Sequence, residues 1–154
     1  MNSRMKRIIA SVVISVGVAT TAVAEVPTVE ISEAWSRASI GTNRPGAAYL
    51  TIRNSGDQTE TVTGLRTNIA MMSEIHLSST NDQGVSSMSP AGEISIAPGD
   101  TVALEPGDLH AMLMKLQRPM IEGETFSLTL ILANGNEVTV DVPILGAAAR
   151  GPDH

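Results

Sequence analysis

Alternation of apolar and polar residues is the feature that most constrains the fold of this chain. Apolar residues occupy every second position over residues 126–132 and again over residues 138–142. Successive side chains of a β-strand point to opposite faces, so this period of two predicts strands with one buried face. No stretch has a helical period of useful length. Earlier segments follow the same pattern, with these residues on one parity: Val29, Ile31 and Trp35, then Ala48, Leu50 and Ile52.

Turn signals separate these segments at short, even intervals. The clearest is Asn134-Gly135, which lies between the two most regular segments and predicts a two-stranded hairpin. Eight to ten short strands with such spacing predict an all-β fold of a single domain, a Greek-key β-sandwich. The remaining turn signals, rich in Gly, Asn, Asp and Pro, are residues 54–57, 81–84, 98–100 and 106–108.

The first 24 residues have the order of an export signal. A basic start at residues 4–7 precedes an apolar run over residues 8–18, and Ala22-Val23-Ala24 fits a signal-peptidase site. The run is shorter than a membrane span of about 20 residues, although an uncleaved anchor is the alternative. We expect a cleaved signal peptide at 1–24, a domain at 25–145 and a flexible tail at 146–154. The product is then periplasmic and not inserted in a membrane.

Composition excludes several classes of function. The net charge of −6 argues against binding to nucleic acid, whose partners present basic faces. The chain has no cysteine, which excludes disulfide frameworks, thiolate zinc sites, iron–sulfur clusters and thiol nucleophiles. It contains no nucleophile elbow, Walker loop or dinucleotide fingerprint. We therefore expect a binding protein and not an enzyme.

Methionine and histidine gather in one part of the chain. All six methionines beyond the signal peptide lie between residues 71 and 120, together with His76 and His110. Residues two apart in a strand share a face, so the side chains of His110 and Met112 are expected side by side, at an edge of the sandwich. His76 shares the polar parity of its segment with Glu74. We expect His76 to point to solvent or to a site, away from the core.

These residue types together indicate a soft metal ion. Met88 lies between two serines in a short polar segment, where a methionine buries little surface. Thioether sulfur suits Cu(I) better than Zn²⁺, Mg²⁺ or Ca²⁺, and neutral imidazole accepts either copper state. Cysteine is a poor choice of copper ligand in an oxidising compartment, because its thiols form disulfides. The residues alone leave two interpretations equally open: a copper site, or surface histidines with core methionines.

The spacing of these residues resembles a known pattern. Eleven residues separate His76 from Met88, twenty-one separate Met88 from His110, and one separates His110 from Met112. This spacing is similar to the His–Met motif of the periplasmic copper chaperones of the PCuAC type. The family often has methionine directly after the first histidine, where this chain has Leu77. Further stretches carry the resemblance over nearly the whole chain after the signal peptide: 34–37, 46–50, 74–76, 106–107, 110–114, 118–119 and 122–124.

The resemblance implies a fold, a metal and a function. The fold would be a cupredoxin-like or immunoglobulin-like sandwich, binding one Cu(I) through His76, Met88, His110 and Met112. The protein would be a monomeric metallochaperone that delivers copper by ligand exchange to cytochrome c oxidase assembly, with Sco-type proteins as partners. Two alternatives are a metal-free structural or adhesion sandwich and a small copper enzyme or electron-transfer protein. The latter would want a cysteine thiolate in a blue-copper site.

Other residues near this region carry simpler expectations. Met71 and Met120 are expected to pack, Met114 to lie in the core beside Leu116, and Met72 to lie at the rim of the site. Trp35 is expected to be a packing residue. Glu74 and Asp108 are candidates to orient the imidazoles through their second nitrogens. His154 ends the predicted tail, where a solvated role is expected.

Overall fold

The computed structural model of the protein describes residues 27–152, so the predicted signal peptide lies outside the described residues. Residues 27–152 form ten strands and no helix, which confirms the predicted all-β fold. The same residues accordingly contain no helix long and apolar enough to cross a membrane. The strands are β1 (Val29–Arg37), β2 (Gly46–Asn54), β3 (Glu60–Thr67), β4 (Ala70–Thr80), β5 (Ser86–Pro90), β6 (Ile94–Ile96), β7 (Thr101–Leu104), β8 (Leu109–Leu116), β9 (Thr125–Leu132) and β10 (Glu137–Leu145).

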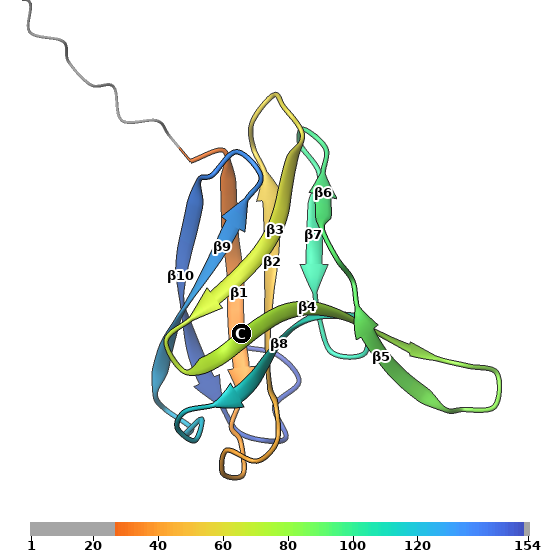
Figure 1. The fold of residues 1–154 in the computed structure, drawn as a ribbon, viewed down its shortest axis with the longest axis vertical. Helices are drawn as coiled ribbons and strands as arrows, with labels where there is room; N and C mark the ends of the chain where they lie inside the picture. Colours follow the sequence, from red (N-terminus) through yellow and green to blue (C-terminus); the bar gives the residue numbers. More distant parts are fainter. Residues whose placement is uncertain (1–26, 153–154) are drawn as a thin grey trace, which may run out of the picture.

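The strands form the two layers of a sandwich (Figure 1). One sheet has the order β5-β4-β8-β2-β1, with β7 also paired to β2, and the other has the order β10-β9-β3-β6. A short parallel pairing of β1 with β10 joins the two sheets along one side. The predicted Asn-Gly hairpin connects β9 to β10, with Gly135 at a φ of 87° that suits glycine.

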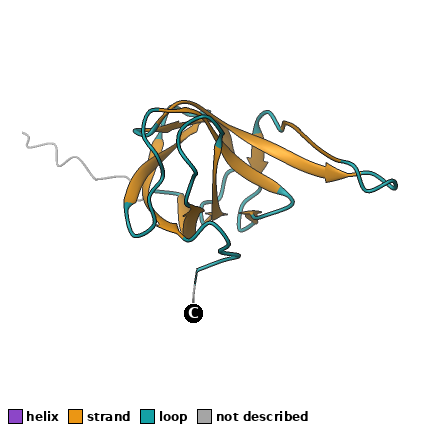
Figure 2. Ribbon diagram, turned by 90° about the horizontal axis from the view of Figure 1, so that it is seen from below, coloured by secondary structure: helices purple, strands orange, loops and turns teal. Residues whose placement is uncertain are grey.

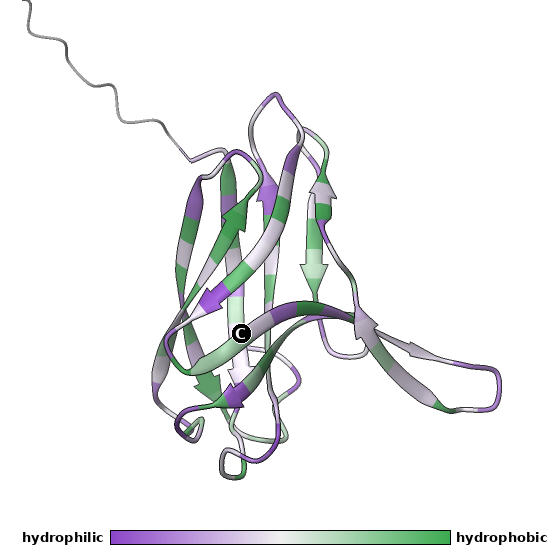
Figure 3. Ribbon diagram, viewed as in Figure 1, coloured by the Kyte–Doolittle hydropathy of each residue, from purple (hydrophilic) through white to green (hydrophobic). Residues whose placement is uncertain are grey.

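The core lies between the two sheets and follows the predicted alternation. Figure 3 shows apolar and polar residues alternating along β10. Phe126, Leu128 and Leu130 of β9 are almost fully buried, and they contribute to one contiguous cluster with the inward residues of the opposing sheet, such as Leu50 and Leu113. A core built from this many fully buried side chains stabilises the sandwich without disulfides.

The parity predicted for Trp35 is wrong. The register of β1 against β2 shifts between Ser32 and Trp35, and Glu33 has a positive φ of 51°. This β-bulge turns the strand over, because one extra residue exchanges the faces of every side chain that follows. Trp35 therefore pairs with Tyr49 on the outer face, whereas Ile31 pairs with core residue Ile52. Its predicted packing role is confirmed, since Trp35 is buried with its ring 4.6 Å from that of Tyr49.

The β4–β5 hairpin extends away from the sandwich. Figure 1 shows β4 and β8 crossing the other strands, and Figure 2, turned by 90°, shows the hairpin projecting from the body. Leu77, on the parity predicted to be apolar, is 39% exposed. It lies in the part of β4 that pairs with edge strand β5, all of whose residues are exposed. This hairpin brings β5, the edge strand, beside the part of β4 that carries His76.

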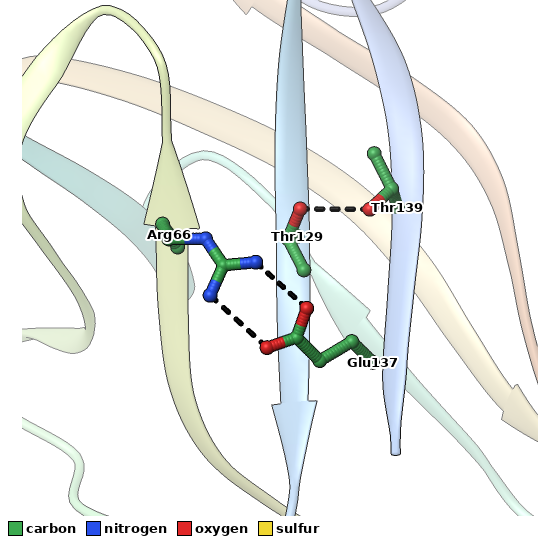
Figure 4. A network of polar contacts seen from close by, with 4 residues as sticks. All are labelled: Arg66, Thr129, Glu137 and Thr139. Atoms are coloured by element: carbon green, nitrogen blue, oxygen red, sulfur yellow. Dashed lines mark hydrogen bonds and ion pairs between the residues drawn. The ribbon is translucent and has the colours of Figure 1, made fainter.

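A polar network ties three strands together on the outer face of the second sheet. The guanidinium of Arg66 on β3 donates two hydrogen bonds, of 3.0 and 2.7 Å, to the carboxylate of Glu137 on β10 (Figure 4). The hydroxyls of Thr129 and Thr139 lie 2.8 Å apart beside this pair. The hydrogen bonds from Arg66 lower the pKa of the Glu137 carboxyl below its usual value.

This ion pair predicts a small, pH-dependent contribution to stability. Because the pKa of Glu137 is lowered on folding, the contribution is present above the unfolded-state pKa and disappears as the pH falls through the folded-state pKa. Both side chains are exposed, so we expect Glu137→Gln to lower the melting temperature only slightly at neutral pH, and not at all in strong acid. Thermal unfolding of both proteins across this pH range checks the expectation. A difference that persists unchanged in acid would contradict it.

Candidate metal centre

The pairing of β4 with β8 brings the two histidines together. His76 stands directly opposite His110, and Glu74 stands opposite Met112. The intervening pair, Ile75 and Ala111, is buried in the core. Since alternate residues of a strand point to opposite faces, the two histidines, Glu74 and Met112 share the outer face. The two imidazole centroids lie 6.2 Å apart. His110 and Met112 lie inside the sheet, because their strand, β8, is flanked by β4 and β2 and is not an edge strand.

The backbone fixes the tautomer of His110. Its Nδ1 lies 3.0 Å from the carbonyl oxygen of Asp108. A carbonyl can only accept, so Nδ1 carries the proton and the lone pair of the neutral ring is on Nε2. Asp108 was expected to orient this ring, and it does so through its backbone. Its carboxylate instead accepts a hydrogen bond from the amide of Leu109 at 2.9 Å.

His76 has the opposite tautomer, and its free nitrogen is buried. Its Nε2–H donates a 3.3 Å hydrogen bond to the carboxylate of Glu74, which confirms the predicted contact. The lone pair is then on Nδ1, a buried atom that has no hydrogen-bond partner among residues 27–152. His76 and His110 are only 9% and 5% exposed, so His76 does not point to solvent. Buried polar atoms are rarely left without a partner, and an unpartnered imidazole lone pair suits a metal ion.

Met88 stands at the exposed side of this pair. It lies on edge strand β5 opposite Ser78, two residues along β4 from His76, and therefore on the same face. Its side chain is 61% exposed, as the polar sequence around it predicts. Met88 and His110 both line a groove of about 340 Å³. The other residues that line this groove are Arg37, Ala47, Tyr49, Ser78, Thr80, Ser86, Ser87, Pro106 and Gly107.

The arrangement offers neutral nitrogen and sulfur donors. Two imidazoles, each with its lone pair set by a hydrogen bond at the other ring nitrogen, share one face with the thioethers of Met112 and Met88. Such donors suit a soft, monovalent ion better than a hard divalent one. The structure brings all four candidate residues onto one face of β5, β4 and β8. Their assignment as metal ligands stays a prediction.

Arg37 on β1 and Tyr49 on β2 border the groove, and neither was predicted from the sequence to be a site residue. The guanidinium of Arg37 lies 5.6 Å from the ring centroid of Tyr49 and 5.7 Å from that of Trp35, and both aromatic residues are buried. Burial raises the pKa of the Tyr49 hydroxyl, and the charge of Arg37 opposes this effect. The available signal was parity: Tyr49 falls between core residues Ala48 and Leu50, so it had to face outward.

The remaining methionines differ in how far they are buried. Met120 is 1% exposed, which confirms its packing role. Met71, expected to pack, is 68% exposed, so that prediction is wrong. Its neighbours Ala70 and Met72 pair with Leu116 and Met114, and between these two lies Lys115, whose positive φ of 54° departs from extended geometry. The same distortion separates Met114 from Leu116: Leu116 belongs to the core cluster, whereas Met114 is half-buried outside it, contrary to expectation. Met72 is 44% exposed, as expected of a rim residue.

The predicted tail makes one contact near the groove. Arg37 Nε donates a 2.6 Å hydrogen bond to the carbonyl oxygen of Ala149. His154 lies outside the described residues, and the mobility of the segment stays a prediction.

Comparisons with known proteins place the fold. The apo PCuAC domain of PmoF2 matches with a TM-score of 0.66 at 20% identity, over 83% of this chain and 98% of that one. The copper-bound PCuAC domain of PmoF2 matches with 0.65 at 20% identity, over 80% and 97%. The solution structure of CuI-DR1885 from Deinococcus radiodurans matches with 0.59 at 28% identity, over 78% and 79%. No curated protein matches the sequence.

A family model matches most of the sequence. Its description is "Putative lipoprotein LpqE-like", and the match covers residues 29–144, from the first strand to the last. This range includes every candidate ligand. The chain therefore belongs to the LpqE-like family, which is of the PCuAC type, as the spacing of its histidines and methionines predicted.

Proposed function

We propose that the protein is a copper chaperone that holds one Cu(I) with His76, Met88, His110 and Met112. The observation that carries the proposal is the histidine pair of β4 and β8. One ring has a buried lone pair to which no described residue donates a hydrogen bond, and the other has its lone pair set by a backbone carbonyl. Preset tautomers of this kind reduce the rearrangement needed when a metal binds.

The donor set favours Cu(I) over other ions. Thioether sulfur is uncharged and soft, and the chain contains no cysteine to supply a thiolate. Neutral donors leave the charge of a monovalent ion uncompensated, which a partly exposed site tolerates better than a closed one. The exposed position of Met88 fits such an open site.

The comparisons support copper as the cargo. One matching structure is the copper-bound PCuAC domain of PmoF2, and another is CuI-DR1885. Leu77 occupies the position after the first histidine where the family often has methionine, and its side chain belongs to the other face of β4. The four proposed ligands do not include this position, so the substitution leaves them intact.

Transfer would proceed by ligand exchange. An acceptor that offers two thiolates approaches the exposed Met88 side, binds the ion together with the remaining ligands, and then takes it. The direction is downhill because thiolates hold Cu(I) more tightly than neutral thioethers. This is the work of a binding protein and not of an enzyme. We propose the periplasm as its compartment, a monomer as its working form, and Sco-type proteins and cytochrome c oxidase assembly as its destination.

A loading and transfer experiment tests the proposal. Protein is titrated with Cu(I) under reducing, oxygen-free conditions, the stoichiometry is measured, and a peptide with two cysteines is then added. We expect tight binding of the first equivalent and its movement to the peptide. Failure to bind Cu(I) would favour a metal-free structural or adhesion sandwich. Tight binding without transfer would favour a copper store.

Export is the prediction that concerns the first 24 residues. The basic start, apolar run and Ala-Val-Ala site predict cleavage after Ala24. Intact-mass measurement of the protein recovered from the periplasm should give a chain beginning at Glu25. A soluble periplasmic form that still carries Met1 would contradict the prediction.

Peroxide should separate the sulfur ligands from the nitrogen ligands. Oxidation to the sulfoxide replaces a soft donor by a polar group, and exposed thioethers react first. We expect mild peroxide to oxidise Met88 before the buried Met120, and to weaken Cu(I) binding until a sulfoxide reductase restores it. Peptide mass mapping paired with a Cu(I) competition titration measures both effects. Unchanged Cu(I) affinity after complete oxidation of Met88 would exclude this residue as a ligand.

A further inference from the structure

Two methionines outside the proposed site stand directly opposite each other on the same face. Met72 of β4 pairs with Met114 of β8, in the same ladder that pairs Glu74 with Met112 and His76 with His110. Directly opposed residues of an antiparallel pair have Cβ atoms about 4.5–5.5 Å apart. Methionine has three rotatable side-chain bonds, so the two sulfurs have the reach to meet on one ion.

Core packing explains this pair poorly. Neither Met72 nor Met114 belongs to the core cluster, and Met72 is 44% exposed. The positive φ of Lys115 breaks the alternation just beyond Met114, which sends Leu116 into the core and leaves Met114 on the outer face. Two methionines placed opposite each other at a partly exposed position contribute little buried apolar area compared with core residues.

A carboxylate and a third thioether lie on the same face beside the pair. Glu74 lies between Met72 and His76 on β4, and its side chain is 48% exposed. Met112 lies between Met114 and His110 on β8, so the outer face of this ladder presents sulfur at three of its six positions. A soft donor pair with a carboxylate beside it suits a monovalent soft ion better than a hard divalent one.

We infer that Met72 and Met114 form a second site for a soft monovalent cation, Cu(I) or Ag(I), beside the proposed histidine–methionine site. The second site has two neutral thioethers and no imidazole, so it fills after the first. Met112 lies next to both sites, which lets an ion held by Met72 and Met114 pass to the histidines without leaving the face.

Methyl-labelled methionine resolves the two sites in one titration. Protein carrying ¹³C in its methionine methyl groups is titrated with Cu(I) without oxygen, and separately with Ag(I), to beyond two equivalents. We expect the first equivalent to shift the methyl signals of Met88 and Met112, and the second to shift those of Met72 and Met114. Met71, which is exposed, and Met120, which is buried, serve as internal controls that stay in place.

Matched variants make the outcome decisive. The double variant Met72→Leu/Met114→Leu keeps side-chain volume and should lose the second equivalent while keeping the first. Met71→Leu should keep both, and His110→Ala should keep the Met72 and Met114 response. The inference is overturned if the double variant still binds two equivalents, or if the Met72 and Met114 signals of the parent never move. Movement of these two signals without any response from Met88 and Met112 would instead contradict the proposed function and leave the second site standing.

Discussion

Replacing His110 by alanine, or Met112 by leucine, is expected to lower the affinity for Cu(I) by more than about 100-fold. Even a change in a residue that only orients a metal ligand typically costs about 10–100-fold in affinity, so loss of a ligand should exceed that range. The change His110→Ala removes the nitrogen whose lone pair is set by the carbonyl of Asp108. Met112→Leu removes only the sulfur, because leucine has nearly the same volume.

A competition titration against a Cu(I) chelator at neutral pH measures these affinities. Met71→Leu is the matched control, because it too exchanges a methionine for leucine. Met71 is exposed and lies on the other parity of β4 from His76. Thermal unfolding of each metal-free variant shows whether it still folds. If folded His110→Ala and Met112→Leu both hold Cu(I) as tightly as the parent, the assignment of ligands is wrong.

Replacing Met120 by alanine is expected to destabilise the protein by about 2–5 kcal/mol, the usual cost of truncating a buried methionine. Met120 is 1% exposed, and its sulfur packs so closely on Gly46 that a Cβ there would overlap it. The cavity left by truncation lies in the core, away from the histidines. The variant that still folds should therefore bind Cu(I) with the affinity of the parent.

Denaturant unfolding of the metal-free protein measures this cost. Met71→Ala is the control, because the side chain it removes is 68% exposed, and it should change stability by less than about 0.5 kcal/mol. The parent must itself unfold cooperatively in the presence of a copper chelator, since its core needs no metal. Equal destabilisation by the two variants, or a metal-free parent without β structure, would contradict this account of the core.

Local pattern was sufficient to predict the strands and their inward faces. The alternation over residues 126–132 and 138–142 became β9 and β10, and the Asn134-Gly135 pair became their hairpin. The outer position of Met112 followed from its distance of two residues from His110. These features depend on neighbours in the sequence, which is why one sequence is enough to predict them.

Features that depend on distant pairing or on irregular backbone were beyond such patterns. The positive φ values of Glu33 and Lys115 each interrupt an alternation, so Trp35 and Leu116 lie on faces that parity alone assigns wrongly. Nothing local indicated that His76 would stand opposite His110, because the register of β4 against β8 is set by the whole sandwich. The exposure of Leu77 likewise follows from its pairing with edge strand β5, which lies far along the chain from the residues that set its parity.

X-ray absorption at the copper K edge of the protein loaded with one equivalent of Cu(I) shows whether two histidines and two methionines hold the ion. The absorption edge reports the oxidation state, and the scattering reports which elements surround the ion. We expect Cu(I) with two nitrogen and two sulfur neighbours, and loss of one sulfur neighbour in Met112→Leu. A first equivalent surrounded by nitrogen and oxygen alone, or by sulfur alone, would contradict it.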